Sequence, residues 1–294
     1  MTTAPDRLLL RLEWRVIRRL DGRVQGDYRT PYRGSGLDFA GLRGYLEQDD
    51  ARHIDWNATA RLAEPQVRQF TEDRELTAWL VLDRSASMTV GVPGRGKHDV
   101  LAELALVLAR LFARGGNRVG ALLHDGATTR VVPPGTGRAQ ALRIGHELAR
   151  TAAARRAGTT DFAAMLDAAW SVARRRSLVV VVSDFIGTGG WDRPLLRLAH
   201  RHDVVALRVV DAADDHLPEA GLLVVEDAET GEQLLVDSGD PLFRSRLRAG
   251  VDERNAVLAG SMRRAGVPLH RIDTDRDLVR ALVEVVTSTR WRRA

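Results

Sequence analysis

The sequence predicts an α/β fold in which a mostly parallel central sheet is flanked by helices. From Thr77 onward, short apolar runs alternate with longer segments whose apolar residues recur at helical spacing. Two of the short runs, 78–82 and 178–182, are apolar throughout, as expected of strands that are buried on both faces. With 294 residues and a hydrophobic content of 44%, the chain has enough apolar material for a large core.

The elements of this region follow in order from local signals. The first strand ends at Asp83, and Gly115-Gly116 ends the helix that follows it. Asp125-Gly126 is the dipeptide of a tight hairpin, so the two strands it joins must be antiparallel, because two residues cannot form a crossover. This pair supplies one antiparallel strand at the edge of the sheet. The expected strands are 78–82, 119–124, 128–132, 178–182 and 204–210, and the expected helices are 99–114, 138–153, 161–174 and 194–202.

The alternation of strands and helices breaks after residue 213 and later resumes. The elements expected here are a hairpin of strands at 222–226 and 233–236, a long arginine-rich helix at 241–265, a strand at 267–272 and a helix at 275–290. Because the last strand and helix return to the earlier pattern, we interpret about 214–265 as an insertion in one domain that spans 77–294.

Residues 1–76 differ from the rest, because they contain few long periodic apolar runs and many opposite charges beside aromatic residues. We interpret them as an accessory segment of the same folding unit. Its charges are expected to pair internally, and Trp56 and Phe70 are expected to be buried against the larger domain.

Composition excludes several classes of function. The chain has no cysteine, which excludes disulfides, thiolate metal sites and thiol nucleophiles. The net charge is +5, but only Lys97 among the 44 basic residues is lysine, and the arginines lack interleaved aromatic residues, so nucleic acid is not an expected partner. No apolar run approaches the roughly 20 residues of a membrane span, and the N-terminus lacks a signal-peptide segment, so we expect a cytoplasmic protein.

Small hydroxyl and carboxylate residues lie in three loops at strand ends or helix starts. They are Asp83, Ser85 and Ser87 in a D-x-S-x-S loop after the first strand, Thr160 before a helix, and Asp184 after the strand at 178–182. Because the carboxyl ends of parallel strands share one edge of a sheet, we expect these loops to meet. Magnesium prefers such oxygen ligands, so the pattern predicts a magnesium site, with manganese or calcium as alternatives. The other interpretation is that these residues only cap a helix and start a turn.

Two enzyme motifs compete with this interpretation. The segment from Gly91 to Lys97 matches G-x-x-x-x-G-K, but His98 stands where a phosphate-binding loop needs a hydroxyl, so a loop before the helix is expected. Asp83 could instead be the nucleophile of a metal-dependent phosphatase or another hydrolase. The acid partner would then be expected two residues further on, where Ser85 stands.

The same residues also resemble the motif of a known protein family. Residues 78–210 resemble a von Willebrand factor type A (vWA) domain, whose metal-ion-dependent adhesion site (MIDAS) has D-x-S-x-S, a threonine in G-x-T and an aspartate after a central strand. All of these positions are present, as Asp83, Ser85, Ser87, Thr160 and Asp184. The segment YRGSGLDFAGLRGYLEQDDARHIDWNATARLAEPQVRQFTEDRE and the ETGE hairpin are similar to the bacterial family called domain of unknown function fifty-eight. One departure is Gln48, where the family commonly has glycine.

The resemblance implies a non-enzymatic adaptor that binds a partner through its metal. Ser85, Ser87 and Thr160 would contact the metal, Asp83 and Asp184 would act through water, and a carboxylate of the partner would complete the coordination. It further implies that the partner is a MoxR-type AAA+ ATPase or its client protein, in protein assembly or remodelling. Many relatives carry N-terminal membrane helices; none is present in this sequence, so membrane attachment is not expected.

Overall fold

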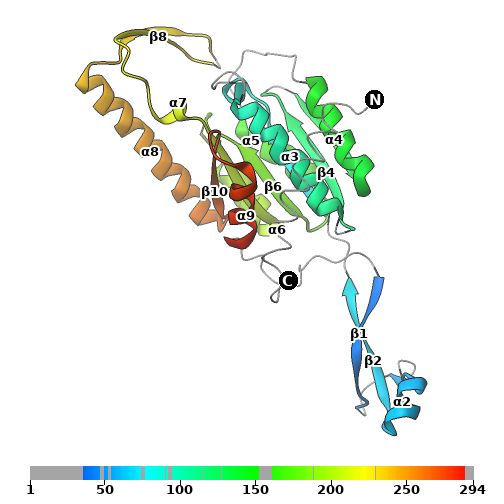
Figure 1. Ribbon diagram of the computed structural model, residues 1–294. Helices are drawn as coiled ribbons and strands as arrows, with labels where there is room; N and C mark the ends of the chain where they lie inside the picture. Colours follow the sequence, from blue (N-terminus) through cyan, green and yellow to red (C-terminus); the bar gives the residue numbers. More distant parts are fainter. Residues whose placement is uncertain are drawn as a thin grey trace.

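The structure is a computed structural model, and part of the chain is described in it. The described residues are 36–46, 50–51, 54–73, 77–89, 91, 95–114, 116–126, 128–151, 161–187, 189–228 and 230–288. They form a six-stranded sheet with helices on both faces and two separate strand pairs (Figure 1).

The central sheet has the strand order β10-β7-β6-β3-β4-β5. Its strands are β3 (Thr77–Asp83), β4 (Arg118–His124), β5 (Thr129–Gly135), β6 (Leu178–Ser183), β7 (Asp203–Val210) and β10 (Leu269–Asp273). Every neighbouring pair is parallel except β4 and β5, which are antiparallel at the edge. The predicted fold class, a vWA-like α/β fold with one antiparallel edge strand, is therefore confirmed.

The two middle strands explain the continuous apolar runs of the sequence. All six residues of β6 and all of β3 after Thr77 are buried, because helices cover both faces of the sheet. Successive side chains of a strand point to opposite faces, so Leu80 and Leu82 belong to one core cluster and Trp79 and Val81 to the other. The carboxyl ends of β3 and β6 thereby come to lie side by side at one edge of the sheet.

Each core cluster is closed by its own set of helices (Figure 1). One face is covered by α3 (Lys97–Arg114), α4 (Gly137–Thr151) and α9 (Leu278–Ser288). The other face is covered by α5 (Phe162–Val172), α6 (Asp192–Arg201) and α8 (Pro241–Ala265). In the part of the chain that the structure describes, no helix is both long enough and apolar enough to cross a membrane.

The segment predicted as an insertion lies between β7 and β10. It contains α7 (Ala212–Asp215), the antiparallel strands β8 (Leu222–Glu226) and β9 (Gln233–Asp237), and α8. The second half of α8 buries Leu258 and Met262 in the core cluster of α5 and α6. The insertion proper is therefore α7, the hairpin and the first half of α8, whereas the second half is part of the domain's helical layer.

The N-terminal strands form a unit of their own. β1 (Gly36–Gly44) and β2 (Gln66–Asp73) are antiparallel, α2 (Trp56–Leu62) packs beside β2, and Figure 1 shows this unit beyond the end of the sheet. The expectation that Trp56 is buried is wrong, because its side chain is 69% exposed and α2 buries none of its residues. The side chain of Phe70 lies outside the described residues, and the domain division at residue 76 stays a prediction.

Candidate metal centre

The D-x-S-x-S loop turns sharply at the carboxyl end of β3. The carboxylate of Asp83 accepts hydrogen bonds from the backbone N–H of Ser85 at 2.9 Å and from the hydroxyl of Ser183 at 2.6 Å. The first of these bonds closes the turn that leads into the short helix η2 (Ala86–Thr89). The turn brings the hydroxyl oxygens of Ser85 and Ser87 to within 3.0 Å of each other, and all three motif side chains are buried.

The end of β6 supplies the second carboxylate. Asp184 is 1% exposed and accepts the backbone N–H of Ile186 at 3.0 Å. Phe185 has a φ of 57°, which is uncommon for a bulky residue, and its N–H donates to the hydroxyl oxygen of Ser183 at 2.8 Å. Ser183 thus joins the two loops, because it also donates to Asp83. No motif in the sequence had indicated a role for Ser183.

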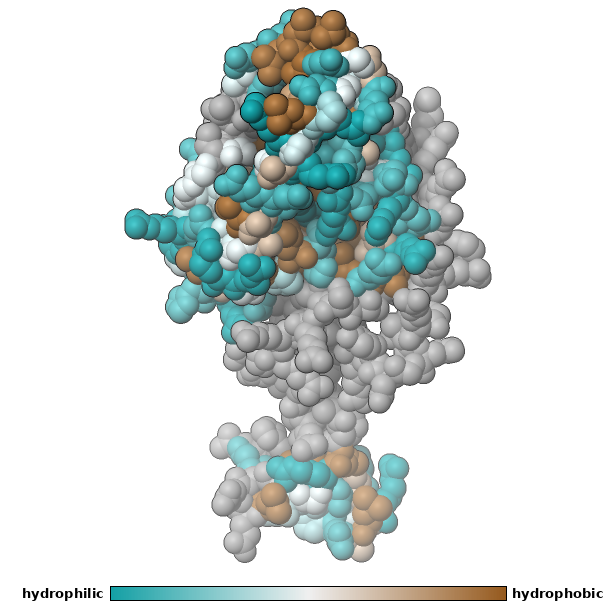
Figure 2. Space-filling view, turned by 90° about the vertical axis from the view of Figure 1, so that its left-hand side faces the viewer, coloured by the Kyte–Doolittle hydropathy of each residue, from teal (hydrophilic) through white to brown (hydrophobic). Residues whose placement is uncertain are grey.

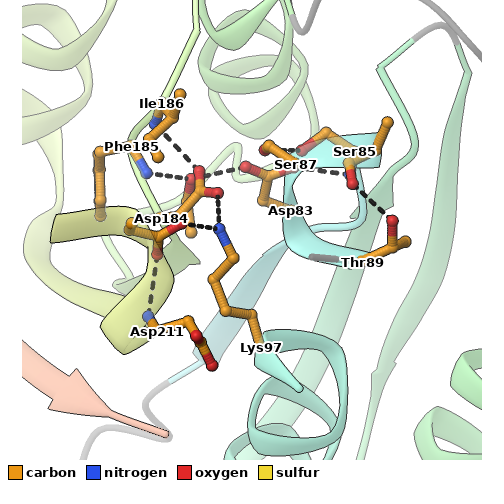
Figure 3. A network of polar contacts seen from close by, with 12 residues as sticks. Asp83, Ser85, Ser87, Thr89, Lys97, Asp184, Phe185, Ile186 and Asp211 are labelled. Carbon is orange, nitrogen blue, oxygen red and sulfur yellow. Dashed lines mark hydrogen bonds and ion pairs between the residues drawn. The ribbon is translucent and has the colours of Figure 1, made fainter. Parts of the chain in front are cut away.

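Lys97 is the main residue of the site that sequence reasoning missed. It is the first residue of α3 and is 1% exposed, and Figure 3 shows its side chain reaching to Asp184. Its Nζ lies 2.8 Å from Oδ2 of Asp184 and 2.9 Å from Oδ1 of Asp214 in α7. The sequence did contain a signal, because Lys97 is the single lysine and all the remaining basic residues among Lys and Arg are arginine. An ammonium group has three N–H donors on one nitrogen, which lets Lys97 bond to two separate carboxylates at once.

The two carboxylates at the strand ends repel each other. Burial and then the neighbouring charge of Asp184 raise the pKa of Asp83 to about 6. Burial alone would lower the pKa of Lys97, but Asp184 and Asp214 together hold it above its ordinary value. Lys97 pairs with Asp184 and Asp214, and Arg208 donates to the backbone carbonyl of Asp184 at 3.2 Å. Asp83 accepts from the neutral donors of Ser85 and Ser183, so a further cation would relieve its repulsion with Asp184.

The donor geometry fits a small divalent cation. Neighbouring ligands of an octahedral magnesium ion at 2.0 to 2.1 Å are about 2.9 Å apart, by geometry from that distance. The two serine hydroxyl oxygens are 3.0 Å apart. Each carboxylate oxygen keeps a lone pair after its present hydrogen bond, so Asp83 and Asp184 can also accept from metal-bound water. No three acidic or histidine side chains among the described residues form a metal-ligating group, so such a cation would depend on these hydroxyls.

The predicted set is brought together except for one residue whose position is not described. Asp83, Ser85, Ser87 and Asp184 meet at the ends of β3 and β6. Thr160 lies in 152–160, outside the described residues. The start of α5 nevertheless lies close to the site, since the ring of Phe162 packs 5.1 Å from that of Phe185.

A second layer of polar contacts ties the site to α7. The carboxylate of Asp211 accepts the N–H of Ala213 and the hydroxyl of Thr274, and Asp214 accepts the N–H of Asp211. Asp211 and Asp214 form a reciprocal capping box, which fixes the carboxylate that faces Lys97. Lys97 therefore links the metal-site loop after β6 to the helix that opens the insertion.

The fold and the site define the class of this protein as a vWA-like α/β domain with a polar centre at the carboxyl ends of its parallel strands. The chain belongs to the DUF58 family, because the family described as "Protein of unknown function DUF58" matches residues 41–257. The uncharacterized protein Rv1480 of Mycobacterium tuberculosis (strain H37Rv) is 38% identical over 279 residues, which cover 95% of this chain and 88% of the relative.

Two solved structures are also similar to this chain. BatB, a conserved hypothetical protein from Bacteroides thetaiotaomicron, is 14% identical with a TM-score of 0.47, and the match covers 72% of this chain and 97% of BatB. The SpRpn10 VWA domain is 11% identical with a TM-score of 0.39, and the match covers 75% of this chain and 98% of that domain.

Proposed function

We propose that this chain is a non-enzymatic, metal-dependent adaptor that binds a partner protein through a divalent cation, magnesium in the first place. The observation that supports the proposal is one buried arrangement: two serine hydroxyls 3.0 Å apart beside two carboxylates whose mutual repulsion adds to burial in raising the pKa of Asp83. Ser85 and Ser87 would contact the cation, and Asp83 and Asp184 would bind it through water. Thr160 remains a predicted ligand.

The chemistry of this donor set favours binding over turnover. The cation would supply an electrophilic centre, since hydroxyl and water ligands neutralise little of its charge. A carboxylate from a partner would then gain a charge-assisted contact. The residues of this chain hold the arrangement: Ser183 and the N–H of Ser85 orient Asp83, the N–H of Ile186 orients Asp184, and Lys97 offsets part of the negative charge.

The proposed partner is a MoxR-type AAA+ ATPase or its client protein, which would contribute an acidic residue to the cation. This part of the proposal is supported by the resemblance of the D-x-S-x-S, G-x-T and aspartate positions to a MIDAS. The role would lie in the assembly or remodelling of another protein.

Metal binding is tested by titration calorimetry of the full chain with manganese and with magnesium. The variant Ser85→Ala/Ser87→Ala should bind manganese at least tenfold more weakly than the wild type. Thr89→Ala is the matched control, because Thr89 is exposed on the same short helix and its hydroxyl donates to the carbonyl of Ala86. Failure of the wild type to bind either metal, or equal binding by the double variant, would overturn the metal site.

Partner binding is tested with a purified MoxR-type ATPase in magnesium and in chelator. Binding that needs the metal and is lost in Ser85→Ala/Ser87→Ala but kept in Thr89→Ala would support the adaptor. Binding that is unchanged in chelator would show that the metal is not part of the interaction. Phosphatase or ATPase turnover by the pure chain that Asp83→Asn abolishes would overturn the non-enzymatic proposal in favour of the hydrolase.

A further inference from the structure

The β8–β9 hairpin presents an exposed apolar face to solvent. In its antiparallel register Leu222 lies opposite Asp237 and Val224 lies opposite Leu235, so these side chains share one face. Leu222 is 71% exposed, Val224 is 63% exposed and Leu235 is 64% exposed. Figure 2 shows this surface as brown atoms at the top of the molecule, where Figure 1 places the hairpin. Large apolar side chains grouped in this way are typical of an interaction surface.

The hairpin is held in place at its base. The hydroxyl of Ser238 donates to the carbonyl of Gly221 and accepts the N–H of Ala220, and Val236, on the opposite face, is 7% exposed. Arg244 at the start of α8 forms an ion pair with Glu219 just before the hairpin. A two-stranded hairpin is at best marginally stable alone, so these anchors indicate that the apolar face is presented in a fixed orientation.

The charges of the segment that carries this face have one sign, although Arg244 of α8 pairs with Glu219 beside it. Every charged side chain from Asp211 to Asp240 is acidic, with His216 the one titratable base, although the chain as a whole has a net charge of +5. On the apolar face itself, Asp237 lies at one end, and Glu226 follows Val224 at the other. Both carboxylates are exposed. The face is therefore an apolar strip with acidic ends in an otherwise basic protein.

We infer that this face docks a partner protein whose complementary surface is apolar and bordered by arginine or lysine. A second copy of this chain joined by a two-fold axis would bring two acidic hairpins together, and this repulsion disfavours self-association. An anionic lipid surface would repel the same carboxylates. A basic apolar protein surface gains from both features, because it buries the three exposed side chains and pairs with Asp237 and Glu226.

This docking surface goes beyond the proposed metal-dependent function, since none of its contacts involves the cation. It lies at the same end of the molecule as α7, whose Asp214 bonds to Lys97 (Figure 1). One partner could therefore cover both surfaces, but the hairpin should bind its probe in the absence of metal.

The test uses the full chain and a labelled amphipathic helical peptide with leucines on one face and arginines along its flanks. Fluorescence anisotropy in chelator should show binding to the wild type, at least tenfold weaker binding to Val224→Thr/Leu235→Thr, and unchanged binding to Val131→Thr. Val131 is the matched control, because it is a 39% exposed valine on the edge strand β5. Threonine keeps the strand propensity and removes apolar surface. Peptides with glutamate for arginine, or with serine for leucine, should each bind the wild type at least tenfold more weakly.

Three outcomes would overturn the proposal. Equal binding of the leucine–arginine peptide by the wild type and the double hairpin variant would show that the face is not its site. If the wild type bound the serine–arginine peptide as tightly as the leucine–arginine peptide, the attraction would come from charge alone. A dimer of the free wild type in sedimentation that the double variant abolishes would assign the face to a second copy. Because Ser85→Ala/Ser87→Ala should leave peptide binding intact, failure here is distinguishable from failure of the metal-dependent function.

Discussion

The metal centre and the β8–β9 hairpin both depart from the usual pattern of apolar side chains inside and charged side chains outside. The centre buries charged residues, and the hairpin exposes apolar ones. At the centre, Asp83, Lys97 and Asp184 are charged residues with at most 1% exposure, whereas on the hairpin Val224 and Leu235 are apolar residues with more than 60% exposure. Both arrangements cost free energy, one by removing charge from water and the other by leaving apolar surface in it. The difference is that the buried charges have partners within the chain.

This contrast shows what a binding partner would add to each region. The carboxylates of the centre already accept hydrogen bonds from Ser85, Ser183, Ile186 and Lys97, so what a cation would add is charge balance. Backbone groups at the base of the hairpin bond to Ser238, but the apolar face of the hairpin stays open to solvent. Disturbing the centre should therefore change stability strongly, and disturbing the hairpin face should change binding and little else.

The largest effect is expected for Lys97→Met. The substitution keeps the length of the side chain but leaves the carboxylates of Asp184 and Asp214 buried without their ammonium partner. Breaking a buried pair in this way costs about 3 to 5 kcal/mol in the free energy of unfolding. Urea unfolding of the metal-free protein measures it, with Arg280→Met as a control, because Arg280 pairs with Glu284 on the exposed side of α9. A loss below 1 kcal/mol would mean that Lys97 does not stabilise the centre.

The second effect concerns pH and Asp83. Its pKa is 3.8 in the unfolded chain and about 6 in the fold, so the native state binds more protons than the unfolded state between these values. The contribution of Asp83 to stability is therefore greatest below pH 4 and falls as the pH rises to 6, by up to about 3 kcal/mol from a shift of roughly two units. Asp83→Asn should lack this fall and be the more stable protein at pH 8 without metal.

The measurement is urea unfolding of the wild type and Asp83→Asn at intervals from pH 4 to pH 8 in chelator. The difference between the two proteins isolates the titration of Asp83 from that of the other acids. A wild type that stays the more stable of the two at pH 8 would show that the ionised carboxylate is not penalised by its burial.

Metal should stabilise the wild type by a comparable amount. A cation that binds only the native state at a hundredfold excess over its dissociation constant raises the free energy of unfolding by about 2.7 kcal/mol. Manganese should raise the melting temperature of the wild type and of Thr89→Ala, and it should have less effect on Ser85→Ala/Ser87→Ala. The same rise in all three proteins would place the stabilising metal elsewhere.

The sequence was sufficient for the features that depend on local pattern. The apolar runs of β3 and β6 placed the two central strands, Asp125-Gly126 correctly indicated the antiparallel edge, and helix α8 has the bounds expected from its pattern. Because the carboxyl ends of neighbouring parallel strands share an edge of the sheet, the sequence alone was enough to predict that Asp83 and Asp184 lie together.

The features that the sequence could not predict depend on contacts between distant segments. Lys97 and Asp214 are 117 positions apart, and no local pattern links the start of one helix to a four-residue helix in an insertion. The last helix was expected to start at residue 275, but α9 begins at Leu278, and the hydroxyl of Thr274 bonds to Asp211. Trp56 was expected to be buried against the larger domain, but its side chain on α2 is 69% exposed.

The smallest effect on stability is expected on the hairpin face. Val224→Thr should change the free energy of unfolding by less than about 0.5 kcal/mol, because its side chain is already 63% exposed. The same substitution at Val180 in β6, where the side chain is 2% exposed, should cost about 1 to 3 kcal/mol, since the new hydroxyl has no water to bond to. Urea unfolding of the two single variants compares the regions with identical chemistry. A cost above 1 kcal/mol at Val224 would mean that the face is covered in the free protein, and the exposed strip would then be unavailable to a partner.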